Sequence, residues 1–249
     1  TASNTTIFGS NYSDTITNRG KKVMILTQGG NDSVSNEGDN TTISGGEDDD
    51  NITNSGKNVT ILGGEGNDSI NNEGSKVLIN AETGDDFLSN KGENATLNGG
   101  EGNDKINGEY GNDHLYGENG HDEIYGGAGN DYIKGGNGDD TIYGDDKSHK
   151  EEGDDTIYGG EGNDTIVAGK GNDHVWGESG NDVIHGSSGY NYLFGGDDND
   201  TITGGSEKDI IWGEKDNDNL DGSYGDDTIF GGYDNDILDR KSTRLNSSH

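Results

Sequence analysis

The segment GGEGNDTIVAGKGNDHVWGESGNDVI, residues 159–184, repeats one nine-residue pattern. In each repeat an Asp is followed two positions later by an aliphatic residue, which gives Ile166, Val175 and Ile184. The same spacing continues outward in both directions, with one six-residue break between Ile142 and Ile157. A fixed short period predicts a solenoid, in which each repeat buries its apolar residue only against neighbouring repeats.

The aliphatic series contrasts with the rest of the composition. The chain has 249 residues, of which 24% are hydrophobic and 47 are Gly, and its formal net charge is −34. Such a composition is typical of disorder, but the few apolar residues fall in register, so we expect a thin solenoid core. The series comprises Ile7, Ile16, Ile25, Val34, Ile43, Ile52, Ile61, Ile70, Ile79, Leu88, Leu97, Ile106, Leu115, Ile124, Ile133, Ile142, Ile157, Ile166, Val175, Ile184, Leu193, Ile202, Ile211, Leu220, Ile229 and Leu238.

The strong acidity limits the partners of the chain. Nucleic acid binding requires basic patches, so we expect no nucleic acid partner, whereas an excess of carboxylates favours cations. No apolar run has the length of a membrane span, so we expect none. The first residue is Thr1 and not Met, which suggests a fragment.

An acidic series precedes the aliphatic one by two residues and sorts into two columns, because alternate repeats of a solenoid lie on opposite edges. The first column contains Asp14, Asp32, Asp50, Asp68, Asp86, Asp104, Asp122, Asp140, Asp164, Asp182, Asp200, Asp218 and Asp236. The second column contains Asp113, Asp131, Asp155, Asp173, Asn191, Asp209 and Asp227, in which Asn191 lacks the charge. Up to residue 107 the other edge instead carries Asn-x-Gly segments, which we interpret as metal-free tight turns that use positive φ. These segments begin at Asn18, Asn36, Asn54, Asn72 and Asn90.

The predicted fold is an all-β parallel β-roll, or β-solenoid, of about thirteen 18-residue coils. Residues 1–107 are expected to carry acidic turns on one edge, and residues 108–239 on both edges. The six-residue break is expected to form a loop insertion at 145–153. The tail at 240–249 abandons the repeat and turns basic, so we interpret it as non-native sequence.

The complete turn motif is Gly-Gly-x-Gly-x-Asp. It occurs as GGEGND at 63–68, 99–104 and 159–164, as GGAGND at 126–131 and as GGNGDD at 135–140. Ca²⁺ prefers six to eight oxygen ligands from carboxylates and backbone carbonyls, and Gly lets a turn direct its carbonyls inward. Stacked turns would place two half-sites around one ion, whereas Mg²⁺ prefers a smaller octahedral site with retained waters.

On these residues the chain resembles the RTX, or hemolysin-type, calcium-binding nonapeptide repeat family. The resemblance implies a parallel β-roll with Ca²⁺ between turns of successive coils. The implied Asp ligands are Asp50 and every later Asp of the two columns. The implied glycine ligands are Gly63, Gly64, Gly66, Gly99, Gly100, Gly102, Gly111, Gly120, Gly126, Gly127, Gly129, Gly135, Gly136, Gly138, Gly159, Gly160, Gly162, Gly171 and Gly180. One ion between adjacent column members gives at most 13 − 1 = 12 and 7 − 1 = 6 ions, about 18 in total.

Four turns depart from the motif at its third glycine. Asp198, Glu207, Asp216 and Asp234 stand there, and we expect them to strain the turn or to add a ligand.

The resemblance also implies a function. It implies calcium-dependent folding of a secreted, extracellular bacterial protein exported by type I secretion. Two alternatives stay open: the repeat region of a larger secreted toxin, protease or lipase, and an adhesin or surface-layer module. The chain contains neither a His-Glu-x-x-His nor a Gly-x-Ser-x-Gly motif, so we expect no catalytic activity in these residues.

Aromatic residues recur beside the aliphatic positions of one sheet. Tyr158, Trp176, Phe194, Trp212 and Phe230 are eighteen residues apart, so they are expected to stack on the outer face. Such a strip favours a contact surface for a protein or a polysaccharide, but it also fits a ladder that only stabilises the sheet. The sequence leaves these two interpretations open.

Overall fold

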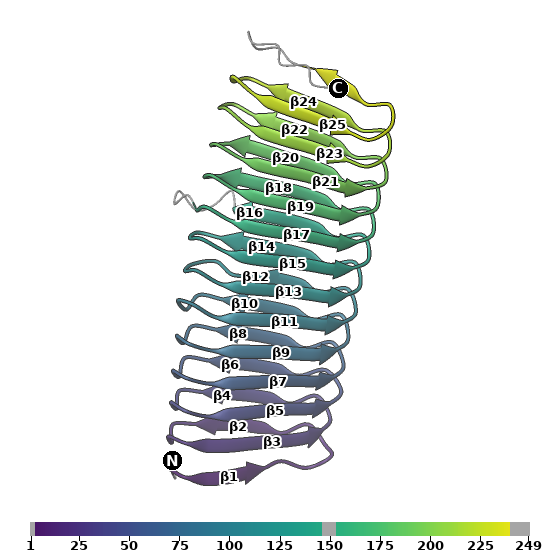
Figure 1. Cartoon of the computed structure of the whole chain (residues 1–249). Helices are drawn as coiled ribbons and strands as arrows, with labels where there is room; N and C mark the ends of the chain where they lie inside the picture. Colours follow the sequence, from purple (N-terminus) through teal and green to yellow (C-terminus); the bar gives the residue numbers. More distant parts are fainter. Residues whose placement is uncertain (1–2, 146–152, 240–249) are drawn as a thin grey trace. The chain divides into compact units, whose positions relative to one another are not determined.

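The chain is an all-β parallel β-solenoid of about thirteen coils, as the repeat predicts (Figure 1). The computed structural model describes residues 3–145 and 153–239, and it divides into two compact units, Thr1–Glu123 and Ile124–His249. We call these unit one and unit two. Nowhere in 3–145 or 153–239 is there a helix long and apolar enough to cross a membrane.

Unit one consists of coils that each contribute one strand to each of two parallel sheets. The odd-numbered strands, in the order in which they pair, are β1 (Thr5–Phe8), β3 (Val23–Gly29), β5 (Thr42–Glu47), β7 (Thr60–Glu65), β9 (Leu78–Thr83), β11 (Thr96–Glu101) and β13 (His114–Asn119). The even-numbered strands are β2 (Thr15–Asn18), β4 (Ser33–Asn36), β6 (Asn51–Asn54), β8 (Ser69–Asn72), β10 (Phe87–Asn90) and β12 (Lys105–Asn107).

Unit two repeats this arrangement with slightly longer even-numbered strands. One sheet contains β15 (Tyr132–Asn137), β17 (Thr156–Glu161), β19 (His174–Ser179), β21 (Tyr192–Asp197), β23 (Ile210–Glu214) and β25 (Thr228–Gly232). The other contains β16 (Thr141–Asp145), β18 (Thr165–Lys170), β20 (Val183–Ser188), β22 (Thr201–Gly205), β24 (Asn219–Ser223) and β26 (Ile237–Asp239). The strand β14 (Glu123–Gly127) begins at the last residue of unit one.

The core is a set of aliphatic ladders inside each unit. Ile43 pairs with Ile61 and Ile52 with Ile70, one coil apart, and all four side chains are fully buried. Period-two alternation puts each of them on the inward face, while the flanking Thr and Asn side chains face outward. Each coil therefore buries its aliphatic residues only against the coils before and after it.

The six-residue break leaves the register intact. Ile142 pairs with Ile166, a separation of 24 residues, or one 18-residue coil plus six. Most of the loop insertion predicted at 145–153 lies outside the described residues, as does the predicted tail at 240–249. The strands before and after the insertion therefore pair in the same register as the other strands, so the insertion does not shift the aliphatic ladder.

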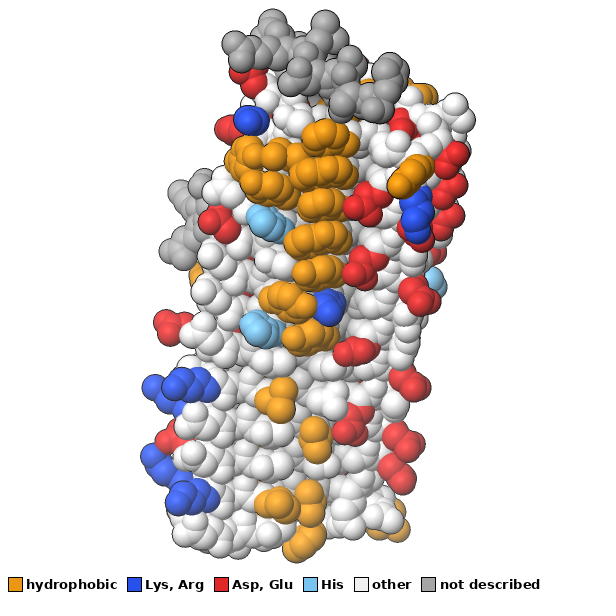
Figure 2. Space-filling model, in the orientation of Figure 1, with side chains coloured by type: hydrophobic (Ala, Val, Ile, Leu, Met, Phe, Trp, Pro, Cys, Tyr) orange, Lys and Arg blue, Asp and Glu red, His pale blue; other side chains and the backbone are white. Residues whose placement is uncertain are grey.

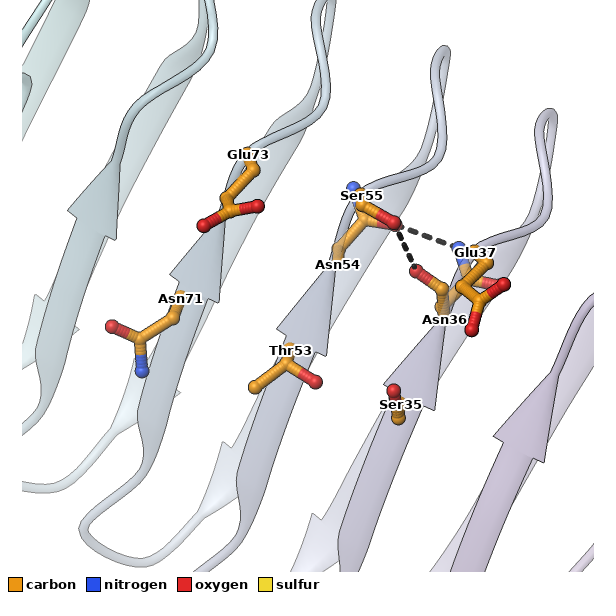
Figure 3. Close-up of a pocket in the computed structure, with 8 residues that line it drawn as sticks. All are labelled: Ser35, Asn36, Glu37, Thr53, Asn54, Ser55, Asn71 and Glu73. Atoms are coloured by element: carbon orange, nitrogen blue, oxygen red, sulfur yellow. Dashed lines mark hydrogen bonds between the residues drawn. The ribbon is translucent and has the colours of Figure 1, made fainter.

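The Asn-x-Gly segments of unit one differ from the prediction that they use positive φ. Positive φ falls four residues after each Asn, for example at Asn40 and Asn58, and at none of the segment glycines. Asn36 and Asn54 instead end strands β4 and β6 and are buried (Figure 3). The glycines are needed for space, because a Cβ on Gly56 would overlap the carbonyl oxygen of Gly38.

The buried asparagines form a continuous ladder of side-chain hydrogen bonds, which we call the Asn ladder. Asn36 Nδ2 donates to Asn54 Oδ1 at 2.7 Å and to the Gly38 carbonyl at 2.9 Å, while Gly38 N–H donates back to Asn36 Oδ1 at 3.2 Å. The same bonds recur along the edge. The Asn ladder comprises Asn18, Asn36, Asn54, Asn72 and Asn90. A neutral side chain that both donates and accepts thus closes this edge without a cation.

The ladder arrangement predicts a large cost for removing one core side chain. Ile61→Ala should lower the free energy of unfolding by about 2–5 kcal/mol, because a fully buried residue leaves a cavity that rigid neighbouring coils cannot fill. Thr60→Ala on the outer face is the control, with an expected loss below about 1 kcal/mol. Urea unfolding in calcium measures both, and equal losses would contradict the ladder core.

Candidate metal centre

Each acidic turn directs one Asp into the interior, immediately before a strand begins. Asp68 precedes β8 and Asp164 precedes β18, and both are buried. One carboxylate oxygen accepts the backbone N–H of the Asp one coil earlier, as in the 2.8 Å bond from Asp50 N–H to Asp68 Oδ1. In unit two, Asp164 N–H donates to Asp182 Oδ1 at 2.8 Å. The acidic columns are therefore continuous hydrogen-bonded series within each unit.

The second carboxylate oxygen of these residues is buried without a hydrogen-bond donor. This holds, among the residues in the described ranges, for Oδ2 of Asp32, Asp50, Asp68, Asp86, Asp104, Asp155, Asp164, Asp173, Asp182, Asp200, Asp209, Asp218 and Asp227. Buried polar atoms without partners are rare in proteins, and a regular series of them indicates a missing positive partner.

Backbone carbonyls lie beside these oxygens. The point at which a Cβ of Gly159 would lie contacts both Asp164 Oδ2 and the Gly177 carbonyl oxygen. The equivalent point at Gly177 contacts Asp182 Oδ2 and the carbonyl oxygen of the next coil, Gly195. Each site thus collects acceptors from two successive coils, which is the donor set that a hard cation requires.

Burial makes the charged form of these carboxylates costly. Desolvation raises the pKa of Asp68 to about 7, with repulsion from Asp86 and Asp50 adding to it. The same effect raises the pKa of Asp200 to about 8 and that of Asp155 to about 9. Ionised carboxylates in this interior therefore need a compensating positive charge.

The turn glycines occupy backbone conformations that other residues rarely adopt. In the motif at 63–68, Gly64 has φ 130° and Gly66 has φ 126°. Where the third glycine is replaced, Asp198, Asp216 and Asp234 have φ of 77°, 69° and 74°, in the left-handed region where the turn was expected to be strained or to gain a ligand. Glu207 does not adopt positive φ, so the strain predicted for that turn is absent.

The residues present fit Ca²⁺ better than a transition metal. No group of three or more His, Cys, Asp or Glu side chains that could hold a metal exists within 3–145 and 153–239. A cation here would depend on one carboxylate per turn together with backbone carbonyls, and oxygen donors of this kind are the ligands of Ca²⁺.

The structure places the predicted Asp ligands in one common environment, with exceptions at the ends. All of them except Asp236 are buried, and Asp32, which lies outside the predicted set, is buried in the same way. Asp14 is more exposed and accepts hydrogen bonds from Ser10. Asp113 accepts the Ala95 N–H at 2.6 Å and lies 3.4 Å from Asn90 Nδ2, so here an amide of the Asn ladder approaches the carboxylate.

The Asn ladder, the counterpart of these sites, was not predicted from the sequence. Its signal was available, because Asn36 lies two residues after Val34 and Asn54 two residues after Ile52, which is the inward spacing. The predicted roles of the glycine carbonyls as ligands stay predictions.

The predicted aromatic residues form a stacked column on the outer face of unit two (Figure 2). We call Tyr158, Trp176, Phe194, Trp212 and Phe230 the aromatic ladder. Successive ring centroids are 4.5–5.5 Å apart and the ring planes lie within 14° of parallel. Lys134 Nζ lies 5.3 Å from the Tyr158 ring centroid. The ring faces are thus covered by one another, and the outer surface presents mainly ring edges.

A known repeat family and a solved structure are similar to this chain. A family model described as the RTX calcium-binding nonapeptide repeat matches residues 44–74, 91–124, 116–146, 151–184, 176–211 and 212–240, which is more than half of the chain. The chain is also similar to the crystal structure of a hyperactive, Ca²⁺-dependent, β-helical antifreeze protein from an Antarctic bacterium, with 20% identity and a TM-score of 0.45. That match covers 94% of this chain and 82% of the other. None of the curated proteins matches the sequence.

The buried oxygens without donors predict that an interior carboxylate binds Ca²⁺ and that an exposed carboxylate of the same turn does not. Asp164→Asn should reduce the number of bound Ca²⁺ ions, because it removes an interior anion. Glu161→Gln removes the same charge from the exposed part of the same turn and should leave the number unchanged. Native mass spectrometry with calcium counts the ions, and an equal loss in both variants would refute the interior site.

Proposed function

The chain belongs to the RTX calcium-binding nonapeptide repeat family, and on that premise we propose that calcium binding drives its folding. The observation that carries the proposal is the series of buried Asp Oδ2 atoms without donors. Ca²⁺ would be held by these carboxylates and by turn carbonyls of successive coils. When bound, it supplies the positive charge that the interior lacks.

Without a cation, the acidic columns oppose folding. The carboxylates of Asp50, Asp68 and Asp86 lie one coil apart, and repulsion and burial both disfavour their ionised forms. Most strands bury a single large aliphatic residue, which provides little apolar surface to offset the loss of chain entropy. Binding that occurs only in the folded state adds directly to the stability of that state.

We propose that the switch operates outside the cell. Extracellular calcium modules typically bind with Kd of about 10⁻⁴–10⁻³ M, so the same chain would stay unfolded in a calcium-poor cytosol. This behaviour suits secretion in an unfolded form followed by folding after export, in keeping with a secreted bacterial protein of the type I route. In this proposal the described residues bind and fold, and any catalytic or toxic activity belongs to a larger protein.

For the aromatic ladder, ring geometry favours a role in holding the sheet over a role in binding polysaccharide. Sugars stack on exposed ring faces, whereas the faces of Trp176 and Phe194 already cover each other at 5.4 Å and 3°. Phe230, at the end of the ladder, is the only member with more than a third of its surface exposed among the five. The proposed function therefore rests on the turns and not on this face.

The folding switch is tested by circular dichroism. In EGTA the far-ultraviolet spectrum should be that of a disordered chain, and millimolar Ca²⁺ should produce a β-sheet spectrum. Mg²⁺ at the same concentration is the control and should produce little change, because it prefers a smaller site with retained waters. Equal β-sheet content in EGTA and in calcium would rule out the switch.

The two units should differ in how much calcium they need. The Asn ladder closes one edge of unit one without ions, so Ile52 and Ile70 should gain amide protection at lower calcium than Ile184 and Ile202 in unit two. Hydrogen exchange of the full chain across a calcium titration measures this. If the amides of both units become protected at the same calcium concentration, the Asn ladder does not reduce the calcium that unit one requires.

A further inference from the structure

The turn at residues 186–191 breaks the second column of unit two at Asn191. Asn191 is fully buried and occupies the interior position that Asp155, Asp173, Asp209 and Asp227 hold in the neighbouring turns. Its Oδ1 accepts the Asp173 N–H at 3.0 Å, just as Asp173 Oδ1 accepts the Asp155 N–H at 2.8 Å. The side chain therefore keeps the hydrogen bond between coils while losing the charge.

The side-chain nitrogen of Asn191 faces backbone carbonyl oxygens of the turns. Asn191 Nδ2 donates to the Gly189 carbonyl at 3.3 Å. The point at which a Cβ of Gly186 would lie contacts both Nδ2 and the Gly204 carbonyl oxygen. At the next turn, the equivalent point at Gly204 contacts Asp209 Oδ2 and the Gly222 carbonyl oxygen. An amide nitrogen thus stands where the turns of Asp155, Asp173, Asp209 and Asp227 place an anionic oxygen without a donor.

The orientation of the amide is fixed by its neighbours. An Asn carbonyl oxygen is an acceptable Ca²⁺ ligand, so a rotated side chain could in principle bind the ion. Rotation would, however, point Nδ2 at the buried N–H of Asp173, so that two donors would face each other and that N–H would lose its acceptor. To place Oδ1 where Nδ2 now lies, Asn191 would have to give up the bond that joins its coil to the preceding one.

We propose, on the basis of the proposed calcium function, that the turn at 186–191 is a built-in calcium-free turn that divides the second column of unit two. Calcium ions then occupy two separate groups, one along Asp131, Asp155 and Asp173 and the other along Asp209 and Asp227. The amide of Asn191 takes the place of the cation, as Asn54 and its neighbours do along the edge of unit one.

At the end of the Asn ladder, a buried amide likewise lies beside a carboxylate of the second column. Asn90 Nδ2 donates to the Gly92 carbonyl at 2.6 Å and lies 3.4 Å from both carboxylate oxygens of Asp113. In unit one a buried amide thus precedes the first carboxylate of the second column, and in unit two a buried amide interrupts that column. This parallel supports the interpretation that the amide ends a calcium array and does not take part in it.

The test is the number of ions bound by the full chain with one residue changed. Asn191→Asp should bind one or two more Ca²⁺ ions than the wild type by native mass spectrometry, because it supplies the missing anionic oxygen to one or both adjacent turns. The substitution suits the fold, since Asp fills this position in the neighbouring turns. Asn181→Asp is the matched control: it adds the same charge at an exposed turn position and should bind no additional ion.

The outcomes separate this inference from the proposed function. If the wild type and Asn191→Asp bind the same non-zero number of ions, the calcium-free turn is wrong while calcium binding stands. If neither protein binds calcium, both proposals fail. A gain in Asn191→Asp that Asn181→Asp reproduces would show that net charge, and not the interior position, sets the number. A calcium-loaded crystal structure with Asn191 Oδ1 as a ligand would also overturn the inference.

Discussion

One polar side chain per turn points into the interior of this protein, and its charge decides how each coil is held to the next. Asp68 accepts a backbone N–H with one oxygen and leaves the other without a donor. Asn54 instead donates and accepts, so that every turn satisfies its neighbour. The aliphatic core is too thin to outweigh this difference, so the interior side chain determines whether a turn requires a cation.

The fold was predictable because its period is short and its core residues obey a simple alternation. Ile166 and Ile184 identify paired strands from spacing alone, and the six-residue break appears as the 24-residue separation of Ile142 and Ile166. The role of Asn36 was not predictable from composition, since Asn before Gly is also typical of turns. Its burial follows from its position two residues after the buried Val34. Because Asn-x-Gly is typical of turns, this spacing was not used to predict that Asn36 is buried.

The sequence predicts which acidic residues lie in the turns, but not which partner each carboxylate oxygen has. The sequence identifies Asp164 and the glycines around it as a unit that suits Ca²⁺. It cannot reveal that one oxygen is used by the preceding coil, because that depends on an N–H at Asp140, 24 residues earlier. The orientation of Asn191 is likewise fixed by the distant Asp173. The hydrogen-bond partner of each side-chain atom therefore depends on backbone groups that are distant in the sequence, which residue identity alone does not reveal.

Along each interior acidic column, the hydrogen bonds run in one direction, from the backbone of one coil to the carboxylate of the following coil. The exposed side chains of the same turns accept in the opposite direction, as Asn67 Oδ1 does from Asp85 N–H. Each interior column is therefore directional within its unit. Asp14, the first Asp of its column, accepts hydrogen bonds from Ser10 of its own turn. A coil therefore continues an interior column only when its chain runs in the same direction as the chain of the neighbouring coil.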